Sequence, residues 1–120
     1  MNIVLLADYK KTGLLVNLCR AYRQILSKYN LISTLNTARL ISNATGLKIY
    51  TMATEIRGAI DQLAAKALYS EIDAVIILRD PDLVDYPTNS LLRACDLRNI
   101  PYATNIASAE LLMIILGHGG

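Results

Sequence analysis

The sequence contains no Trp and no Phe, and among its 120 residues there are only one His and two Cys. The single histidine, His118, excludes a catalytic centre that needs several imidazoles. Cys19 and Cys95 are too few and too far apart for a zinc site with four protein ligands, unless carboxylates complete it. We therefore expect no metal site, and any chemistry must use Asp, Lys, Arg, Thr and backbone amides.

Long hydrophobic runs and strongly charged runs are also missing. The longest apolar run, residues 111–116, is far shorter than the ~20 residues that cross a bilayer, and residues 1–8 lack the basic region of a signal peptide. The net charge of +2 is spread along the chain without a basic run, which argues against a polynucleotide partner. We expect a cytoplasmic protein with no membrane partner, whose cysteines are reduced core residues.

What the sequence does contain is enough hydrophobic residues, 53%, to build one core, and we expect a single domain over residues 1–120. Short apolar runs typical of buried strands alternate with segments whose apolar residues recur at helical spacing. Strands are expected at residues 3–7, 31–34, 48–52, 74–78 and 102–104. Helices are expected at about 12–27, 36–44, 58–70, 88–97 and 107–116, with Gly46 and Gly117 ending the second and the last.

Five strand-then-helix units predict an α/β fold, a Rossmann-like five-stranded parallel sheet within a three-layer α/β/α sandwich. In sheets of this kind, ligands bind beyond the carboxyl ends of the strands. The segments that follow the expected strands hold much of the polar chemistry of the chain, and they span residues 8–13, 34–38, 54–58, 79–87 and 104–108.

Two motifs resemble those of the methylglyoxal synthase family. Residues 40–46 read LISNATG, close to the family pattern L-I-S-x-A-T-G, and residues 100–107 read IPYATNIA, close to I-P-x-A-T-N-x-A. Asp80-Pro81 and Leu91-Leu92-Arg93 match more weakly, in the same order and spacing. The resemblance covers residues 3 to about 112. It implies the family fold, which also serves as an anion-binding regulatory domain in carbamoyl-phosphate synthetases, and a homo-oligomer, typically a hexamer.

The enzymes of this family convert dihydroxyacetone phosphate to methylglyoxal and phosphate. A carboxylate removes a proton next to the carbonyl group, and phosphate leaves from an enediolate. The reaction needs a base, donors that hold the phosphate and electrophilic help for the enediolate oxygen. The resemblance implies that no metal or other cofactor is required.

The resemblance assigns roles to residues of the first two loops. Against the family pattern A-H-D-x-x-K, the chain has lost the His but offers Asp8 as a site carboxylate and Lys11 as a phosphate cation. Their alternative roles are a helix cap and a solvated lysine. Against T-G-T-T-G, the donors Thr34, Asn36 and Thr37 are present, but both glycines are replaced. Glycine lets backbone amides approach an anion closely, so a plain helix cap by Thr34 or Asn36 is the alternative.

The third loop departs most from the family. The family pattern S-G-P-x-G-G-D-x-Q carries the catalytic Asp, and Ile60 occupies its position here. Asp61 lies one residue further on, which on a helix is a rotation of ~100° away from the site. Glu55 is a possible substitute carboxylate, and further contacts to a phosphate are expected from Thr54, Arg57 and Gly58. The alternative is that Glu55 and Arg57 are solvated loop charges.

The last two loops add three candidates. Asp80 follows the fourth expected strand, and the loop after it lacks the histidine with which family enzymes orient the substrate, although Asp85 lies near that position. In the fifth loop, Thr104 and Asn105 belong to the matching motif I-P-x-A-T-N-x-A and are candidate contacts to a ligand. Tyr9 or Tyr86 could stack on a base, or pack as half-buried core.

Because the scaffold matches while the base, the loop glycines and the histidine do not, we expect a catalytically reduced domain rather than an enzyme. It would bind a phosphorylated or anionic small molecule, such as a nucleotide, as a sensor or sequestering protein. The contacts would be Lys11, Thr34, Asn36, Thr37, Thr54, Arg57, Gly58, Thr104 and Asn105. The alternative is an active methylglyoxal synthase, a carbon–oxygen lyase that uses Asp61, Asp8 or Asp80 as its base.

Overall fold

Five parallel strands form the centre of the protein in a computed structural model, which describes residues 1–52, 56–83 and 90–119. The spatial order is β3-β2-β1-β4-β5, and every neighbouring pair is parallel. The strands are β1 (Asn2–Ala7), β2 (Asn30–Thr34), β3 (Ile49–Met52), β4 (Ala74–Leu78) and β5 (Tyr102–Ala103). Each begins and ends within one residue of its prediction, and the parallel sheet is confirmed.

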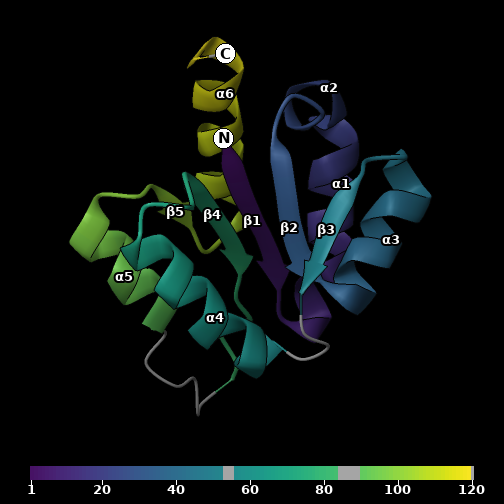
Figure 1. The fold of residues 1–120 in the computed structure, drawn as a ribbon. Coiled ribbons are helices and arrows are strands. Elements are labelled where there is room, and N and C mark those ends of the chain that lie inside the picture. Colours follow the sequence, from purple (N-terminus) through teal and green to yellow (C-terminus); the bar gives the residue numbers. More distant parts are fainter. Residues whose placement is uncertain (53–55, 84–89, 120) are drawn as a thin grey trace.

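Helices cover both faces of this sheet and complete the predicted three-layer α/β/α sandwich (Figure 1). A short 3-10 helix, η1 (Tyr9–Lys11), leads from β1 into the first α-helix. One face is covered by α1 (Thr12–Ala21), α2 (Arg23–Leu26), α3 (Leu35–Thr45) and α6 (Ile106–Gly119). The other face is covered by α4 (Ile56–Leu68) and α5 (Ser90–Arg98).

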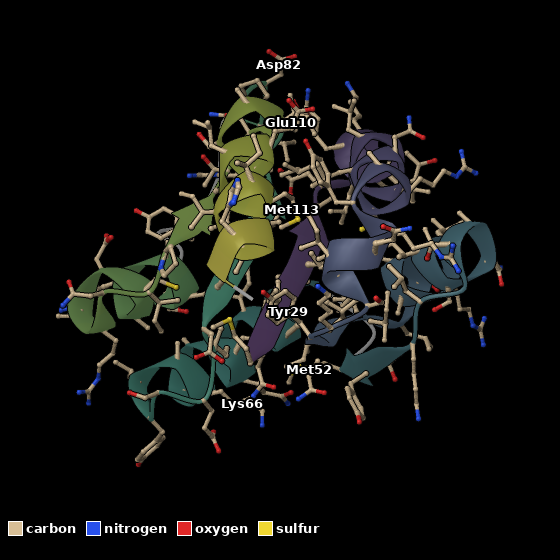
Figure 2. The ribbon with its side chains drawn as sticks, turned by 90° about the horizontal axis from the view of Figure 1, so that it is seen from above. Tyr29, Met52, Lys66, Asp82, Glu110 and Met113 are labelled. Carbon is tan, nitrogen blue, oxygen red and sulfur yellow. The ribbon has the colours of Figure 1, made fainter. Side chains whose placement is uncertain are left out.

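The two hydrophobic cores lie on opposite sides of the central strand. In β1, Ile3 and Leu5 belong to the cluster under α1, α3 and α6, whereas Val4 and Leu6 belong to the cluster under α4 and α5. All four are fully buried, which explains why this strand is a continuous apolar run rather than an alternating one. Figure 2 shows Met113 of α6 and Lys66 of α4 on opposite sides of β1.

Two of the predicted helix boundaries change in the structure. The helix expected over residues 12–27 is interrupted at Tyr22, where φ is −112° and ψ is 26°, so that α1 and α2 are separate. Gly46 ends α3 as predicted, with φ at +76° and its N–H donating to the Ser42 carbonyl oxygen at 2.8 Å. The prediction that Gly117 ends the last helix is wrong, because α6 continues to Gly119.

Gly117 has a packing role instead of a terminating one. A Cβ atom at this position would lie 2.9 Å from Cδ1 of Ile25, closer than side chains tolerate, so the missing side chain lets α6 pass close to α2. Tyr29, just after α2, strengthens the same contact by donating its hydroxyl to the Leu116 carbonyl oxygen at 2.8 Å. Within the described residues, no helix has the length and hydropathy that crossing a membrane requires.

Both cysteines are core residues, as predicted from the sequence. Cys19 of α1 and Cys95 of α5 are fully buried free thiols. Burial disfavours the thiolate and raises the pKa of Cys19 to about 12. The pKa of Cys95 is raised to about 11, mainly by burial and further by the neighbouring Asp96 carboxylate. Because the thiolate is the reactive form, these side chains act as small apolar groups in the core.

Of two buried hydroxyl groups, we expect that of Ser33 to lower the free energy of unfolding and that of Thr45 to raise it. Ser33 in β2 is 1% exposed and its Oγ has no hydrogen-bond partner among the described residues, whereas Thr45 donates to the Ile41 carbonyl oxygen at 2.6 Å and accepts from the Leu47 N–H at 3.1 Å. We expect Ser33→Ala to raise the free energy of unfolding by about 1 kcal/mol and Thr45→Val to lower it by about 1–2 kcal/mol. Urea denaturation measures both, and equal losses would contradict this reading.

Candidate functional site

The connection order of the sheet places a crevice beside β1. The chain runs from β1 to β2 and β3 on one side and then crosses to β4 on the other side of β1. In open parallel sheets, ligands bind outside the carboxyl ends of the strands at such a reversal. Asp8 follows β1 at this point, and Arg79 and Asp80 follow β4. The predicted location of the site therefore coincides with the topological switch point.

Asp8 links the ends of the two central strands. Its Oδ2 accepts the backbone N–H of Asp80 at 2.6 Å, and its own N–H donates to the Leu78 carbonyl oxygen at 2.9 Å. Asp8 is 8% exposed and Asp80 is 6% exposed, so this charge-assisted hydrogen bond is shielded from water. Asp8 precedes η1, but its side chain makes no capping hydrogen bond. The carboxylate therefore organises the strand ends and does not cap the helix.

A pocket of about 430 Å³ opens next to this pair of residues. It brings together Lys11, Asp80, Thr104 and Asn105, which the sequence had predicted as site residues from three different loops. The volume suits a small substrate. The described residues that line it are Lys11, Leu14, Leu78, Arg79, Asp80, Pro81, Leu83, Thr104, Asn105 and Ile106.

The electrostatics of the pocket favour an anion. Lys11 and Arg79 both line it and supply two cationic side chains. Lys11 directly precedes α1 and Asn105 directly precedes α6, so the positive ends of two helix dipoles open onto the same space. The Asn105 Oδ1 accepts the Ser108 N–H at 2.9 Å, which holds the start of α6 in place. A phosphate group is the kind of ligand that this arrangement can hold.

Asp80 is the acidic residue among the described residues that line the pocket, and its carboxylate is oriented by a hydrogen bond. Its Oδ1 accepts the N–H of Asp82 at 3.0 Å, and its backbone is held by Asp8. Its Oδ2 receives no hydrogen bond from any residue of the described ranges. A buried carboxylate with one oxygen oriented and the other open can accept a proton from a ligand in the pocket.

The predicted phosphate loop lies at the neighbouring strand end and does not line this pocket. Thr34 ends β2 and directly precedes α3, but its side chain makes no capping hydrogen bond. Asn36 and Thr37 belong to the first turn of α3, where Thr37 is buried and Asn36 is exposed. These three residues share the carboxyl edge of the sheet with Asp8, because β2 pairs directly with β1. The alternative role proposed for Thr34, a side-chain cap of α3, is therefore not seen.

Asp61 and Gly58 lie on α4, which covers the other face of the sheet, and neither lines the pocket. The Asp61 side chain is exposed, and its Oδ1 accepts the Ser90 hydroxyl of α5 at 3.0 Å. Ile60, at the position of the family's catalytic Asp, packs against the core cluster between α4 and the sheet. The helical rotation expected between residues 60 and 61 therefore directs the Asp61 carboxylate toward α5. Several further candidates fall outside the described residues or have undescribed side chains, namely Thr54, Glu55, Arg57, Asp85 and Tyr86.

Six residues that line the pocket were not predicted as site residues from the sequence, namely Leu14, Leu78, Arg79, Pro81, Leu83 and Ile106. Arg79 directly follows the buried strand β4 and lies within residues 79–87, which the sequence predicted as a strand-end loop. A cation at that position could have been predicted to bind an anionic ligand. Leu14, Leu83 and Ile106 form apolar walls, and as scattered hydrophobic residues they carried no signal.

We expect Asp8→Ala to lower the free energy of unfolding by at least about 1.5 kcal/mol, because the buried N–H of Asp80 loses its acceptor. The matched control is Asp61→Ala, which removes an exposed carboxylate with a single hydroxyl partner and should cost less than about 0.5 kcal/mol. Chemical denaturation of the two variants measures the difference. Equal stability of the two variants would show that the Asp8–Asp80 hydrogen bond does not hold the strand ends together.

Comparisons with known proteins agree on one family, although a scan against models of protein families matched none. Methylglyoxal synthase of Caldicellulosiruptor saccharolyticus is 47% identical over 99% of this chain and 86% of its own length. Methylglyoxal synthase of Thermoanaerobacter sp. strain X514 is 43% identical over 94% of this chain and 88% of its own. The crystal structure of methylglyoxal synthase from Elizabethkingia anophelis NUHP1 matches with a TM-score of 0.84 at 29% identity, covering 93% of this chain and 76% of that one.

These relatives overturn the expectation of a catalytically reduced sensor or sequestering domain. That expectation depended on the missing base, glycines and histidine, yet proteins that share 37–47% of the residues over nearly the full chain are named for the enzyme. The structure also offers two buried carboxylates at the strand ends, Asp8 and Asp80, so the position of Ile60 does not leave the site without an acid. The family resemblance seen in the sequence is confirmed, and the chain belongs to the methylglyoxal synthase family.

Proposed function

We propose that the protein is an active methylglyoxal synthase, a carbon–oxygen lyase that converts dihydroxyacetone phosphate to methylglyoxal and phosphate. The observation that carries this proposal is the 47% identity over 99% of the chain to a protein of that name. The pocket beyond β1 and β4 supports it, because its two cations and two helix N-termini suit a phosphorylated substrate. A volume of about 430 Å³ has room for a three-carbon phosphate.

In this proposal Asp80 is the base. Its open Oδ2 takes a proton from the hydroxyl-bearing carbon next to the substrate carbonyl group, and the electron pair of that C–H bond forms the enediolate. The enediolate then expels phosphate, whose oxygen keeps the electron pair of the broken C–O bond, and the resulting enol rearranges to methylglyoxal. Asp8 acts as a positioning residue, since it holds the Asp80 backbone at 2.6 Å.

The phosphate would lie between Lys11, Arg79 and the start of α6. Charge-assisted hydrogen bonds from these groups stabilise the phosphate more as it leaves and gains charge than while it is esterified. Thr104 and Asn105 border the same space and would orient the substrate. Thr34, Asn36 and Thr37 are proposed to act from the adjacent strand end, and Gly58 has no proposed contact.

We expect purified protein to release methylglyoxal from dihydroxyacetone phosphate with a kcat of at least about 1 s⁻¹. Asp80→Asn should lower kcat by roughly 10²–10⁴-fold, because the amide cannot take the proton. Lys11→Gln should lower kcat as well as raise KM, since Lys11 holds the esterified phosphate and stabilises it further as it leaves. Colorimetric detection of methylglyoxal, with phosphate release measured in parallel, gives both constants.

Asp61→Asn is the control for the assignment of the base, because Asp61 is an exposed acid outside the pocket and should change kcat less than about threefold. A large loss in Asp61→Asn together with full activity of Asp80→Asn would transfer the role of base to Asp61. If the wild-type protein binds dihydroxyacetone phosphate without any turnover, the proposed activity itself is wrong.

We also propose that the enzyme works as a homo-oligomer, and the finer expectation of a hexamer stays a prediction from the family resemblance, as does the cytoplasmic location. The supporting feature is α6, which is apolar on its outer side as well as its buried side. Leu111, Ile114 and Ile115 are 64%, 48% and 66% exposed on this helix. Contacts between copies of the chain would remove such residues from water.

Sedimentation velocity at micromolar protein concentration should therefore show a species of several chains. The double substitution Leu111→Ser with Ile115→Ser should shift it toward the monomer, because the apolar contact area is lost. Leu97→Ser is the matched control, since Leu97 of α5 is 60% exposed but lies on another helix. A wild-type monomer at this concentration would sink the proposal.

A further inference from the structure

A second pocket of about 310 Å³ lies at the opposite ends of the strands from the candidate active site. It is formed by the connection from α2 to β2, the connection from α3 to β3, and the first residues of both strands. Figure 2 looks onto this end of the molecule and shows Tyr29, one of the lining residues, near its middle. The lining consists of Arg23, Leu26, Ser27, Tyr29, Asn30, Leu31, Gly46, Leu47, Lys48 and Tyr50.

The charge of this pocket is of one sign. Arg23 and Lys48 line it, and no Asp or Glu lines it within residues 1–52, 56–83 and 90–119. Neither cation forms an ion pair with any residue that the structure describes. A neighbouring hollow shares Asn30 and Tyr50 with it and contributes Lys66, and none of its described lining residues is acidic. In a chain with 12 basic and 10 acidic residues, this concentration of unpaired cations around a concave surface attracts anions.

The remaining lining residues favour a flat apolar body beside the anionic group. Leu26, Leu31 and Leu47 are buried and form the apolar floor. Tyr50 of β3 is 57% exposed, so its ring is available at the rim for stacking. Tyr29, another lining residue, donates its hydroxyl to the Leu116 carbonyl oxygen, so its ring is held in place before any ligand binds.

We propose that this pocket binds a small organic anion, with its phosphate or carboxylate group beside Arg23 and Lys48 and its flat apolar body over the leucine floor against Tyr50. The site shares no residue with the pocket that holds Asp80, and it lies at the other ends of the same strands. The proposal therefore does not depend on the lyase activity, and either can fail without the other.

Amide chemical-shift titration of the wild-type protein tests the proposal with phenyl phosphate and benzoate as probes. We expect saturable shifts of the Gly46 and Lys48 amides, which border the pocket. Each of Arg23→Gln and Lys48→Gln should weaken binding roughly fivefold, because an exposed cation contributes up to about 1 kcal/mol to such a contact. The two probes distinguish a phosphate ligand from a carboxylate ligand.

Lys28→Gln is the matched control, since Lys28 is an exposed lysine of the same α2–β2 connection that does not line the pocket, and the affinity of this variant should equal that of the wild type. Phenol tests the need for the charge and inorganic phosphate tests the need for the apolar body, and both should bind more weakly than phenyl phosphate. The proposal is overturned if the Gly46 and Lys48 amides do not move, if Lys28→Gln weakens binding as much as Lys48→Gln, or if phenol or inorganic phosphate binds as tightly as phenyl phosphate.

Discussion

The hydrogen bond from the Asp80 N–H to the Asp8 carboxylate is the contact on which the candidate active site depends. It joins residues that follow β1 and β4. The chain adds β2 and β3 on one side of β1 and then β4 and β5 on the other, so the switch point lies between β1 and β4. The register between these strands runs from Ile3 opposite Ala74 to Ala7 opposite Leu78, and Asp8 extends this pairing by one further step. Lys11 and Arg79 are placed by the same two strand ends, so the cations of the pocket share one rigid base.

This geometry gives the chain a way to keep a carboxylate at the site although Ile60 stands where the family has its catalytic Asp. An acid on α4 reaches the site from a helix that covers one face of the sheet. Asp80 instead follows a central strand, and the side chain is oriented by the Asp82 N–H. A group on a strand end with such backbone contacts loses little freedom when it acts, which is what positioning a base requires.

Most of the fold was predictable from the sequence, because buried parallel strands leave continuous apolar runs such as residues 3–7 and 74–78. The motif match correctly indicated the family. Helix boundaries were less predictable: Gly117 has the composition of a helix stop, but its role depends on the position of Ile25, about ninety residues away in the chain. The site was predicted in part. Local patterns pointed to Lys11, Asp80, Thr104 and Asn105, whereas Arg79 and the apolar walls require knowing which loops meet.

The functional expectation failed for a related reason. Counting missing motif residues treats each position as irreplaceable, yet the structure contains two buried carboxylates at the same edge of the sheet, and relatives at 47% identity are named for the enzyme. Which acid a site uses depends on distances and burial, and a single sequence reports neither.

The burial of the two thiols has a consequence for the proposed lyase activity. Methylglyoxal is an α-oxoaldehyde, an electrophile that adds to thiolates, and its concentration is highest around the protein that releases it. Cys19 and Cys95 are both fully buried, and pKa values of about 12 and 11 keep them protonated at neutral pH. The core thus presents no sulfur nucleophile to methylglyoxal, and both cysteines are protected from the product that the proposed reaction would release.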